Sequence, residues 1–300
     1  MNKKNVSNDA MELTTKKYAK RSQFSEIMHR LLQNKGSLIG LIIIVLIILC
    51  CIVSMILIDY EMMTDNNIKE RLLKPSWKYP FGTDSMGRNL FYRVLYGARF
   101  SLAIGFGGSA IAATLGIMLG AIAGYYGGIA ETLIMRFAEV MSSIPGMLLG
   151  MVIMSTLGAS LPNLIITVGV TAIPIYVRMT RASILGLRNQ EFVEAAHSIG
   201  LPNFRIIFAH ILPNGLSPII ITFTMNIGGM ILIASGLSFL GFGINVPNPE
   251  WGALISGGRE FMRNSSYIMT FPGLFIMATV LAFNMIGDGL RDALDPKLKK

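Results

Sequence analysis

The chain has 300 residues, of which 52% are hydrophobic and only 14% are charged, and its mean hydropathy is +0.56. This composition is typical of a protein of the lipid bilayer and excludes an ordinary water-soluble domain. The net charge is +9, but eight of the 26 Lys and Arg precede residue 36, just ahead of the first apolar run. That placement is typical of membrane anchoring, so we expect contact with membrane lipid and no nucleic-acid partner.

The first apolar run covers residues 37–58 and follows a polar N-terminal segment, 1–36. At about 1.5 Å per residue it is long enough to cross roughly 30 Å of hydrocarbon, which predicts a retained span and not a cleaved signal peptide. Cys50 and Cys51 are neighbours inside this run and have no metal-ligand spacing with any histidine. Neither a disulfide framework nor a zinc site is predicted.

A polar segment, 59–99, comes next and contains the sequence YPFGTDSMGR. Its glycines suit a tight turn, and Thr83 or Asp84 can cap a helix that begins near residues 86–88. A role limited to local folding and a contact with another protein are both open for this turn.

The remainder is apolar from residue 100 and is divided by polar or glycine-rich breaks. These breaks predict five further spans, at residues 100–124, 134–157, 161–184, 214–240 and 267–288. The expected fold is therefore an all-α membrane protein with six transmembrane helices. Five of the helices form a core, 100–289, and a polar tail, 290–300, follows.

Orientation is predicted from the basic residues at the span ends. They are frequent in the N-terminal segment, in the breaks at 124–136 and 191–214 and in the C-terminal tail, and positive loops usually stay in the cytoplasm. The 59–99 loop opposes this with seven Lys and Arg, although five Asp and Glu accompany them. We expect a multi-pass plasma-membrane protein with both termini in the cytoplasm and the 59–99 loop outside.

Gly116, Gly120 and Gly124 repeat every four residues and so share one helix face, which allows another backbone to approach closely. Packing between spans of one bundle is the favoured interpretation, and a special subunit contact is the alternative. Apart from Glu139 and residues near the span ends, the spans lack the Asp, Glu and Lys that proton-driven carriers use. This disfavours a self-powered carrier without excluding it.

The break at 191–214 reads EFVEAAHSIGLPNFRIIFAHILPN and predicts two short helices. Gly200 ends the first helix and Pro202 prevents its continuation. In the first helix the expected apolar face consists of Phe192, Ala195, Ala196 and Ile199, and in the second of Phe204, Ile207, Phe208 and Ile211. Such an element packs on its own bundle or enters a groove of a cytosolic partner. In the loop after it, Trp251 is expected to anchor at the membrane interface.

Within this break, Glu194-Ala195-Ala196, Gly200 and Leu212-Pro213 resemble the EAA loop of ATP-binding-cassette importer permeases. His210 in AHILPN is similar to the dipeptide, oligopeptide and nickel branch of that family. Four other stretches resemble its second permease subunit in the same order: YPFGTDSMGRNLFYRVLYGARFSLAIG, GYYGG with Arg136 and Pro145, LSFLGFGINVPNPEWGALI and FNMIGDGLRDALDPKLK. Asn89 stands where that subunit more usually has an aspartate. Each stretch is weak alone, but five in the right order are specific.

The resemblance implies a type I importer permease fold in which the EAA loop forms a coupling helix that docks in a cleft of an ATPase subunit. It assigns to coupling the residues Glu191, Glu194, Ala195, Ala196, Gly200, Leu201, Leu212 and Pro213. The alternative for Glu194 is a solvated helix charge. The implied partners are a homologous permease in a heterodimer, two ATP-binding subunits that hold ATP and Mg, and an extracytoplasmic solute-binding protein. Phe81, Gly82, Asp84, Gly87 and Arg88 are expected to contact the binding protein or the sister permease.

Catalysis is not expected of this chain. It has no G-x-x-x-x-G-K-[ST] sequence, and the glycine-rich run 105–108 lacks the lysine that holds phosphates. His29, His197 and His210 are expected at the surface or in packing, with no metal or cofactor bound by this chain. Short peptides are the expected cargo, while nickel, a metallophore complex and glutathione stay open. The competing classes are a stand-alone secondary carrier or channel and a membrane scaffold without transport.

Overall fold

The computed structural model describes residues 23–244 and 247–295, and most of them are helical. Within these residues, five helices are long and apolar enough to cross a membrane: α3 (Lys35–Leu57), α5 (Leu90–Tyr126), α8 (Leu161–Leu187), α12 (Leu216–Phe239) and α14 (Tyr267–Leu294). A sixth span is formed if α6 (Gly128–Ser143) and α7 (Gly146–Leu157), which meet at an angle of 92°, are counted together. The all-α membrane fold predicted from the sequence is confirmed.

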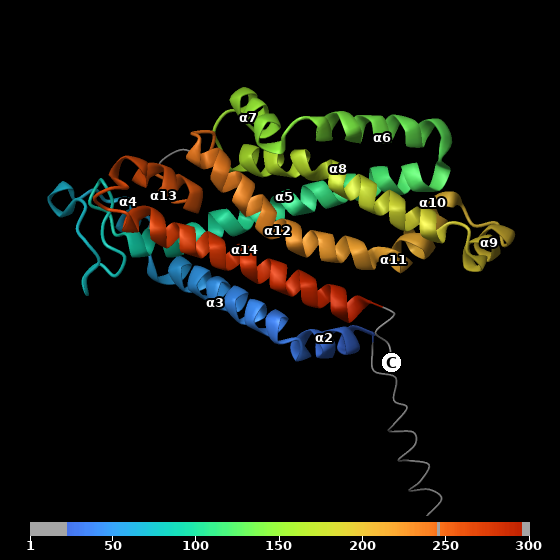
Figure 1. Cartoon of the computed structure of the whole chain (residues 1–300), viewed down its shortest axis with the longest axis horizontal. Coiled ribbons are helices and arrows are strands. Elements are labelled where there is room, and N and C mark those ends of the chain that lie inside the picture. Colours follow the sequence, from blue (N-terminus) through green and yellow to red (C-terminus); the bar gives the residue numbers. More distant parts are fainter. Residues whose placement is uncertain (1–22, 245–246, 296–300) are drawn as a thin grey trace, which may run out of the picture.

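The short elements lie at the ends of these helices. They are α2 (Gln23–Gln33), α4 (Tyr60–Thr64), the 3-10 turn η1 (Ile68–Glu70), α9 (Glu191–Ser198), α10 (Asn203–Arg205), the π-helix η2 (Ile206–Ile211), α11 (Leu212–Asn214), α13 (Trp251–Gly258) and the 3-10 turn η3 (Arg259–Phe261). Figure 1 shows the long helices side by side along the longest axis of the molecule. One end, here called the loop end, carries α4 and α13, and the opposite end carries α9 and α10. The first residues of α3 and the last of α14 point toward the α9 end.

Two predicted spans differ from the observed helices. The span expected at 100–124 is α5, which begins ten residues earlier at Leu90, so residues 90–99 of the predicted loop are helical. The side-chain Oδ1 of Asn89 accepts the amide of Phe91 at 3.0 Å and caps this helix. Arg93, in the first turn, is buried in the protein. Thr83 and Asp84, the predicted caps, do not cap a helix.

The span expected at 134–157 is broken between α6 and α7. Ile144 is extended, with φ −93° and ψ 127°, because the ring of the following Pro145 disfavours helical geometry at the residue before it. The sequence pattern of apolar residues continues across the break, so hydropathy alone does not reveal it. The other predicted spans match helices to within a few residues, except that α14 continues to Leu294 and includes part of the predicted tail.

The glycine repeat of α5 packs against α8 of the same chain. A Cβ atom added to Gly120 would lie 2.6 Å from the carbonyl oxygen of Val177, and one added to Gly124 would lie 2.8 Å from the Cβ of Ile184. These positions hold the two backbones closer than any side chain would allow. Packing inside one bundle is therefore confirmed for this repeat.

Candidate functional sites

The predicted coupling segment begins with α9, and its end is a complete glycine-dependent cap. Gly200 has φ +77°, its amide donates to the carbonyl of His197 at 2.9 Å, and the amide of Leu201 donates to the carbonyl of Ala196 at 3.2 Å. This pair of bonds is the Schellman motif, which needs a left-handed residue just after the helix. Gly200 thus reverses the chain where the sequence predicted the turn.

Only part of the predicted apolar face of α9 is buried. Val193 and Ala196 face the bundle and join a hydrophobic cluster with Ile184 of α8 and Ala121 of α5. Ala195 is exposed and Ile199 is 75% exposed, so the predicted face was wrong at both positions. The helix is rotated because Val193, which is larger than Ala195, buries more apolar surface against Ile206 and Ile207, members of the same cluster.

The opposite face of α9 projects away from the bundle. Glu191, Glu194 and Ala195 are exposed, and neither carboxylate takes part in an ion pair within residues 23–244 and 247–295. Just beyond the turn, Phe204 is 71% exposed and its ring lies 4.7 Å from that of Phe208. Exposed aromatic side chains such as Phe204 are frequent at protein contacts.

The second part of the segment is a π-helix and not the uniform helix that was predicted. Pro213 has no amide to donate, so no bond can form to the carbonyl four residues earlier, and the amide of Leu212 instead bonds to the carbonyl of Ile207, five residues earlier. The wider turn places Ile206, Ile207 and Ile211 in the cluster that holds α9. Leu212 is half-buried, and Pro213 is exposed.

Tyr125 was not singled out from the sequence, although it lies in the GYYGG stretch. Its hydroxyl oxygen lies 3.0 Å from Nε2 of His197 and donates to Oδ1 of Asn203 at 3.0 Å. The last turn of α5 is thereby bonded to the end of α9 and to the start of α10. Only the fold brings these three residues together, because 72 positions separate Tyr125 from His197.

At the loop end the predicted outer contacts lie largely inside the protein's own packing. The Phe81 ring stacks on Phe271 at 4.0 Å, and Gly82 and Gly87 both have φ +77°, which glycine adopts without strain. Asp84 is buried, and its Oδ1 accepts the amides of Met86 at 2.8 Å and Arg88 at 3.0 Å. The carboxylate therefore organises its own turn.

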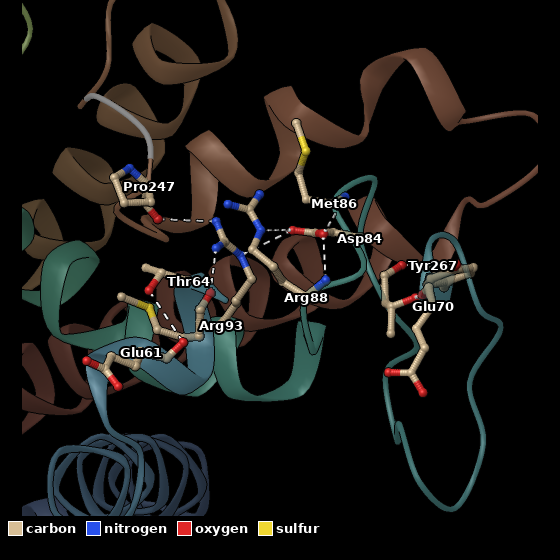
Figure 2. Close-up of polar contacts among 11 residues, drawn as sticks. Glu61, Thr64, Glu70, Asp84, Met86, Arg88, Arg93, Pro247 and Tyr267 are labelled. Carbon is tan, nitrogen blue, oxygen red and sulfur yellow. Dashed lines mark hydrogen bonds and ion pairs between the residues drawn. The ribbon is translucent and has the colours of Figure 1, made fainter. Parts of the chain in front are cut away.

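Arg93, on the first turn of α5, joins three segments at this end (Figure 2). Its guanidinium donates to the carbonyls of Met63 at 2.9 Å and Pro247 at 3.3 Å, and its Nε lies 3.5 Å from Oδ2 of Asp84. The sequence interpretation missed Arg93 because it treated residues 90–99 as loop. Asn89 is a good N-cap residue, and a helix predicted to begin after it would have placed Arg93 in its first turn, with the side chain pointing into the protein.

Trp251 is fully buried, and its indole Nε1 donates to the carbonyl of Val94 at 2.9 Å, so the predicted interfacial anchor was wrong. Glu250 beside it caps α13, because its carboxylate accepts the amides of Gly252 at 2.8 Å and Ala253 at 2.9 Å. Trp251 thus packs on α5 instead of facing lipid.

The helix with the EAA sequence, α9, projects from the end of the bundle and lies against the long helices α5 and α8 through its buried face. Residues 116–300 match the family described as the binding-protein-dependent transport system inner membrane component. The chain belongs to this family. Residues 22–75 also match the N-terminal transmembrane domain of oligopeptide transport permease C.

Relatives with known names match three quarters or more of the chain. It is 44% identical over 282 residues to the dipeptide transport system permease protein DppC of Alkalihalophilus pseudofirmus, covering 94% of this chain and 92% of that protein. It is 40% identical over 289 residues to DppC of Haemophilus influenzae, covering 94% and 98%. It is also 43% identical over 225 residues to the glutathione transport system permease protein GsiD of Pectobacterium atrosepticum, covering 75% of each.

A solved structure supports the fold of this inner membrane component independently. A chain of the MetNI methionine ABC transporter in an inward-facing conformation superposes with a TM-score of 0.57 at 18% identity, covering 69% of this chain and 98% of that one. The fold is therefore that of an ABC importer permease.

Proposed function

We propose that this chain is the membrane-spanning permease subunit of an ATP-driven importer of dipeptides or oligopeptides. The observation that carries the proposal is the 44% identity to a dipeptide transport permease over 94% of the chain. Glutathione is the second candidate substrate, because a glutathione transport permease is 43% identical over 75% of the chain. Both are short peptides with free carboxylates.

In this proposal the exposed face of α9 is where an ATPase subunit docks. Support comes from its position: Glu191, Glu194 and Ala195 face outward, while Val193 and Ala196 are held by α5 and α8 through one hydrophobic cluster. A force on the outer face would pass to both long helices, because closely packed side chains transmit displacement with little compression. ATP and Mg would be bound by the ATPase, outside this chain.

The proposed assembly pairs this chain with a homologous permease, two ATPases and an extracytoplasmic binding protein. The chain belongs to a family of binding-protein-dependent transport systems, which supports the last of these partners. The α9 end is proposed to face the cytoplasm together with both termini. The basic N-terminal segment supports this orientation, and so does the direction of α3 and α14 toward the α9 end in Figure 1.

The test is copurification and uptake with the assembled transporter. Glu194→Arg reverses a charge at the proposed docking face, and Gly200→Pro forbids the φ of +77° at the turn. We expect both variants to lose the ATPase subunit and ATP-driven uptake of a labelled dipeptide. Asp288→Arg reverses the charge of an exposed carboxylate on α14 that makes no ion pair within the described residues, so it is the matched control and should retain both.

Uptake that survives both substitutions and needs no ATPase would overturn the proposal in favour of a stand-alone carrier. The substrate is tested with the transporter reconstituted in liposomes, by comparing uptake of a labelled dipeptide with uptake of labelled glutathione, each delivered by the binding protein.

A further inference from the structure

A cavity of about 350 Å³ lies at the loop end, enclosed by the 84–93 stretch, the end of α12 and α13. Its polar lining comes from Asp84, Arg88, Arg93 and Ser238, with Asn248 and Ser256 beside them. The volume lies within the range of small-molecule sites. Nothing in the coupling function accounts for a charged cavity at this end.

The two guanidinium groups in the cavity share one carboxylate. Nε of Arg88 donates to Oδ2 of Asp84 at 2.7 Å, and Nε of Arg93 lies 3.5 Å from the same oxygen. The other oxygen of Asp84 is already bonded to two backbone amides. One positive charge is therefore left without a counterion among the lining residues, at a place where charges are shielded from water.

The positive charge without a counterion belongs to Arg88, whose guanidinium group faces the cavity. The terminal nitrogens of Arg93 are bonded to backbone carbonyls, whereas those of Arg88 donate no hydrogen bond within the described residues. The Arg88 side chain is only 11% exposed. Figure 2 shows its guanidinium group beside that of Arg93, with only its Nε turned to Asp84.

A second group in the same cavity also lacks a partner. The Ser238 side chain is buried, lines the cavity and has a hydroxyl oxygen without a hydrogen bond among the residues described. A hydroxyl can donate to an anion, so the cavity offers two unused donors of different kinds. A fork of two parallel N–H groups fits the two oxygens of a carboxylate.

The space outside the cavity favours the approach of an anion. A larger hollow shares Ser85, Ser256 and Gly257 with the cavity and is lined by Arg71, Arg259 and Glu260. Taken together, the two spaces present four guanidinium groups against two carboxylates. Clustered charge of one sign raises the local concentration of the opposite ion.

We propose that this cavity binds a carboxylate, with the terminal carboxylate of a short peptide as its source and Arg88 and Ser238 as its donors. The proposal rests on the proposed peptide-import function and adds a recognition point within this chain. It distinguishes a peptide with a free C-terminus from one whose terminus is amidated.

The experiment uses the complex of both permeases and the ATPases in lipid nanodiscs, without ATP and without the binding protein, so that binding to the permeases is measured apart from transport. The probes are the dipeptide Ala-Ala, its C-terminal amide and acetate, titrated by calorimetry. We expect Ala-Ala to bind, the amide to bind at least about tenfold more weakly, and Arg88→Gln to weaken Ala-Ala to the same extent. Arg263→Gln removes an exposed charge at the same end and should bind as the wild type does.

Two further arms keep the proposal open to refutation. Ser238→Ala removes only the unpaired hydroxyl, so it should fold normally and weaken Ala-Ala by a few fold. Equal binding of Ala-Ala and its amide, or unchanged binding in both variants, would overturn the site. If Arg88→Gln instead weakens docking of the binding protein and leaves Ala-Ala unchanged, the carboxylate belongs to that protein and the peptide assignment is wrong. Wild-type uptake driven by ATP tests the import function separately.

Discussion

The hydroxyl oxygen of Tyr125 lies 3.0 Å from Nε2 of His197, and the two rings are nearly parallel, with centroids 6.3 Å apart and an angle of 19°. The same hydroxyl donates to Asn203, so its oxygen accepts the Nε2 proton of His197. One side chain of α5 thus bonds to both helices of the coupling segment, on either side of the Gly200 turn.

Tyr125→Phe should separate ATP hydrolysis from transport. The ring stays, both hydrogen bonds are lost, and the stability cost should be only about 1 kcal/mol for each exposed bond. We expect ATPase activity to persist while the solute imported per ATP falls several fold. Tyr126→Phe, at an exposed neighbour, is the control and should not change this ratio. An unchanged ratio in Tyr125→Phe would show that the hydrophobic cluster alone holds the segment.

Gly200→Ala should weaken ATPase binding through backbone strain alone. No atom lies within 4 Å of the position that a Cβ would take, so the cost comes from the φ of +77°. That strain is about 1–2 kcal/mol for alanine and less for asparagine. We expect an affinity loss of roughly 5- to 30-fold for alanine and a smaller loss for Gly200→Asn, measured by titrating the ATPase. Equal losses would point to a direct contact at this position instead.

Gly120→Ala should destabilise the bundle. The added Cβ would approach the carbonyl oxygen of Val177 to 2.6 Å, so α5 and α8 must separate. Gly186→Ala is the matched control because it lies exposed on α8 with no atom within 4 Å of a Cβ. We expect a lower melting temperature for the first variant only. The measurement is size-exclusion chromatography of samples heated to increasing temperatures. A lowered value for both would show that the loss does not come from the contact with Val177, because alanine favours a helix more than glycine does.

The loop before α5 should loosen in acid. Hydrogen bonds from Lys78 at 2.5 Å, and from Tyr79, hold the pKa of Glu70 below its ordinary value of 4.5. A lowered carboxyl pKa contributes stability that is complete above 4.5 and lost as the pH falls through the folded-state value. With 5-fluorotryptophan, Trp77 and Trp251 give two fluorine signals, and only that of Trp77, on this loop, should shift below pH 4.5. Glu70→Gln should abolish the acid transition, and a transition that remains in this variant would assign it to another group.

The sequence predicted the long helices well because each is a long apolar run bounded by polar breaks. The Gly200 turn was also predictable from local sequence, because Gly200 and Pro202, two residues later, together leave the chain few geometries other than a turn. The rotation of α9 was missed because several apolar residues compete for one buried face, and only packing against α5 and α8 selects Val193 over Ala195.

The missed residues share a different cause. Tyr125 and Arg93 lie far along the chain from their partners, and their roles depend on which helices become neighbours. The π-helix was missed because the Leu212-Pro213 pair was interpreted only as a link into the next span. Its physical signal, the missing proline amide, was nevertheless present in the sequence.

The length of α5 connects the two ends of the molecule through a single helix. Its 37 residues extend over about 55 Å, well beyond the roughly 30 Å of hydrocarbon, with Arg93 near one end and Tyr125 near the other. If the helix pivots at mid-membrane as a stiff lever, a tilt of about 10° displaces each end by about 5 Å in opposite directions. A small displacement of the coupling segment would then move the cavity directly, because one continuous helix connects the two.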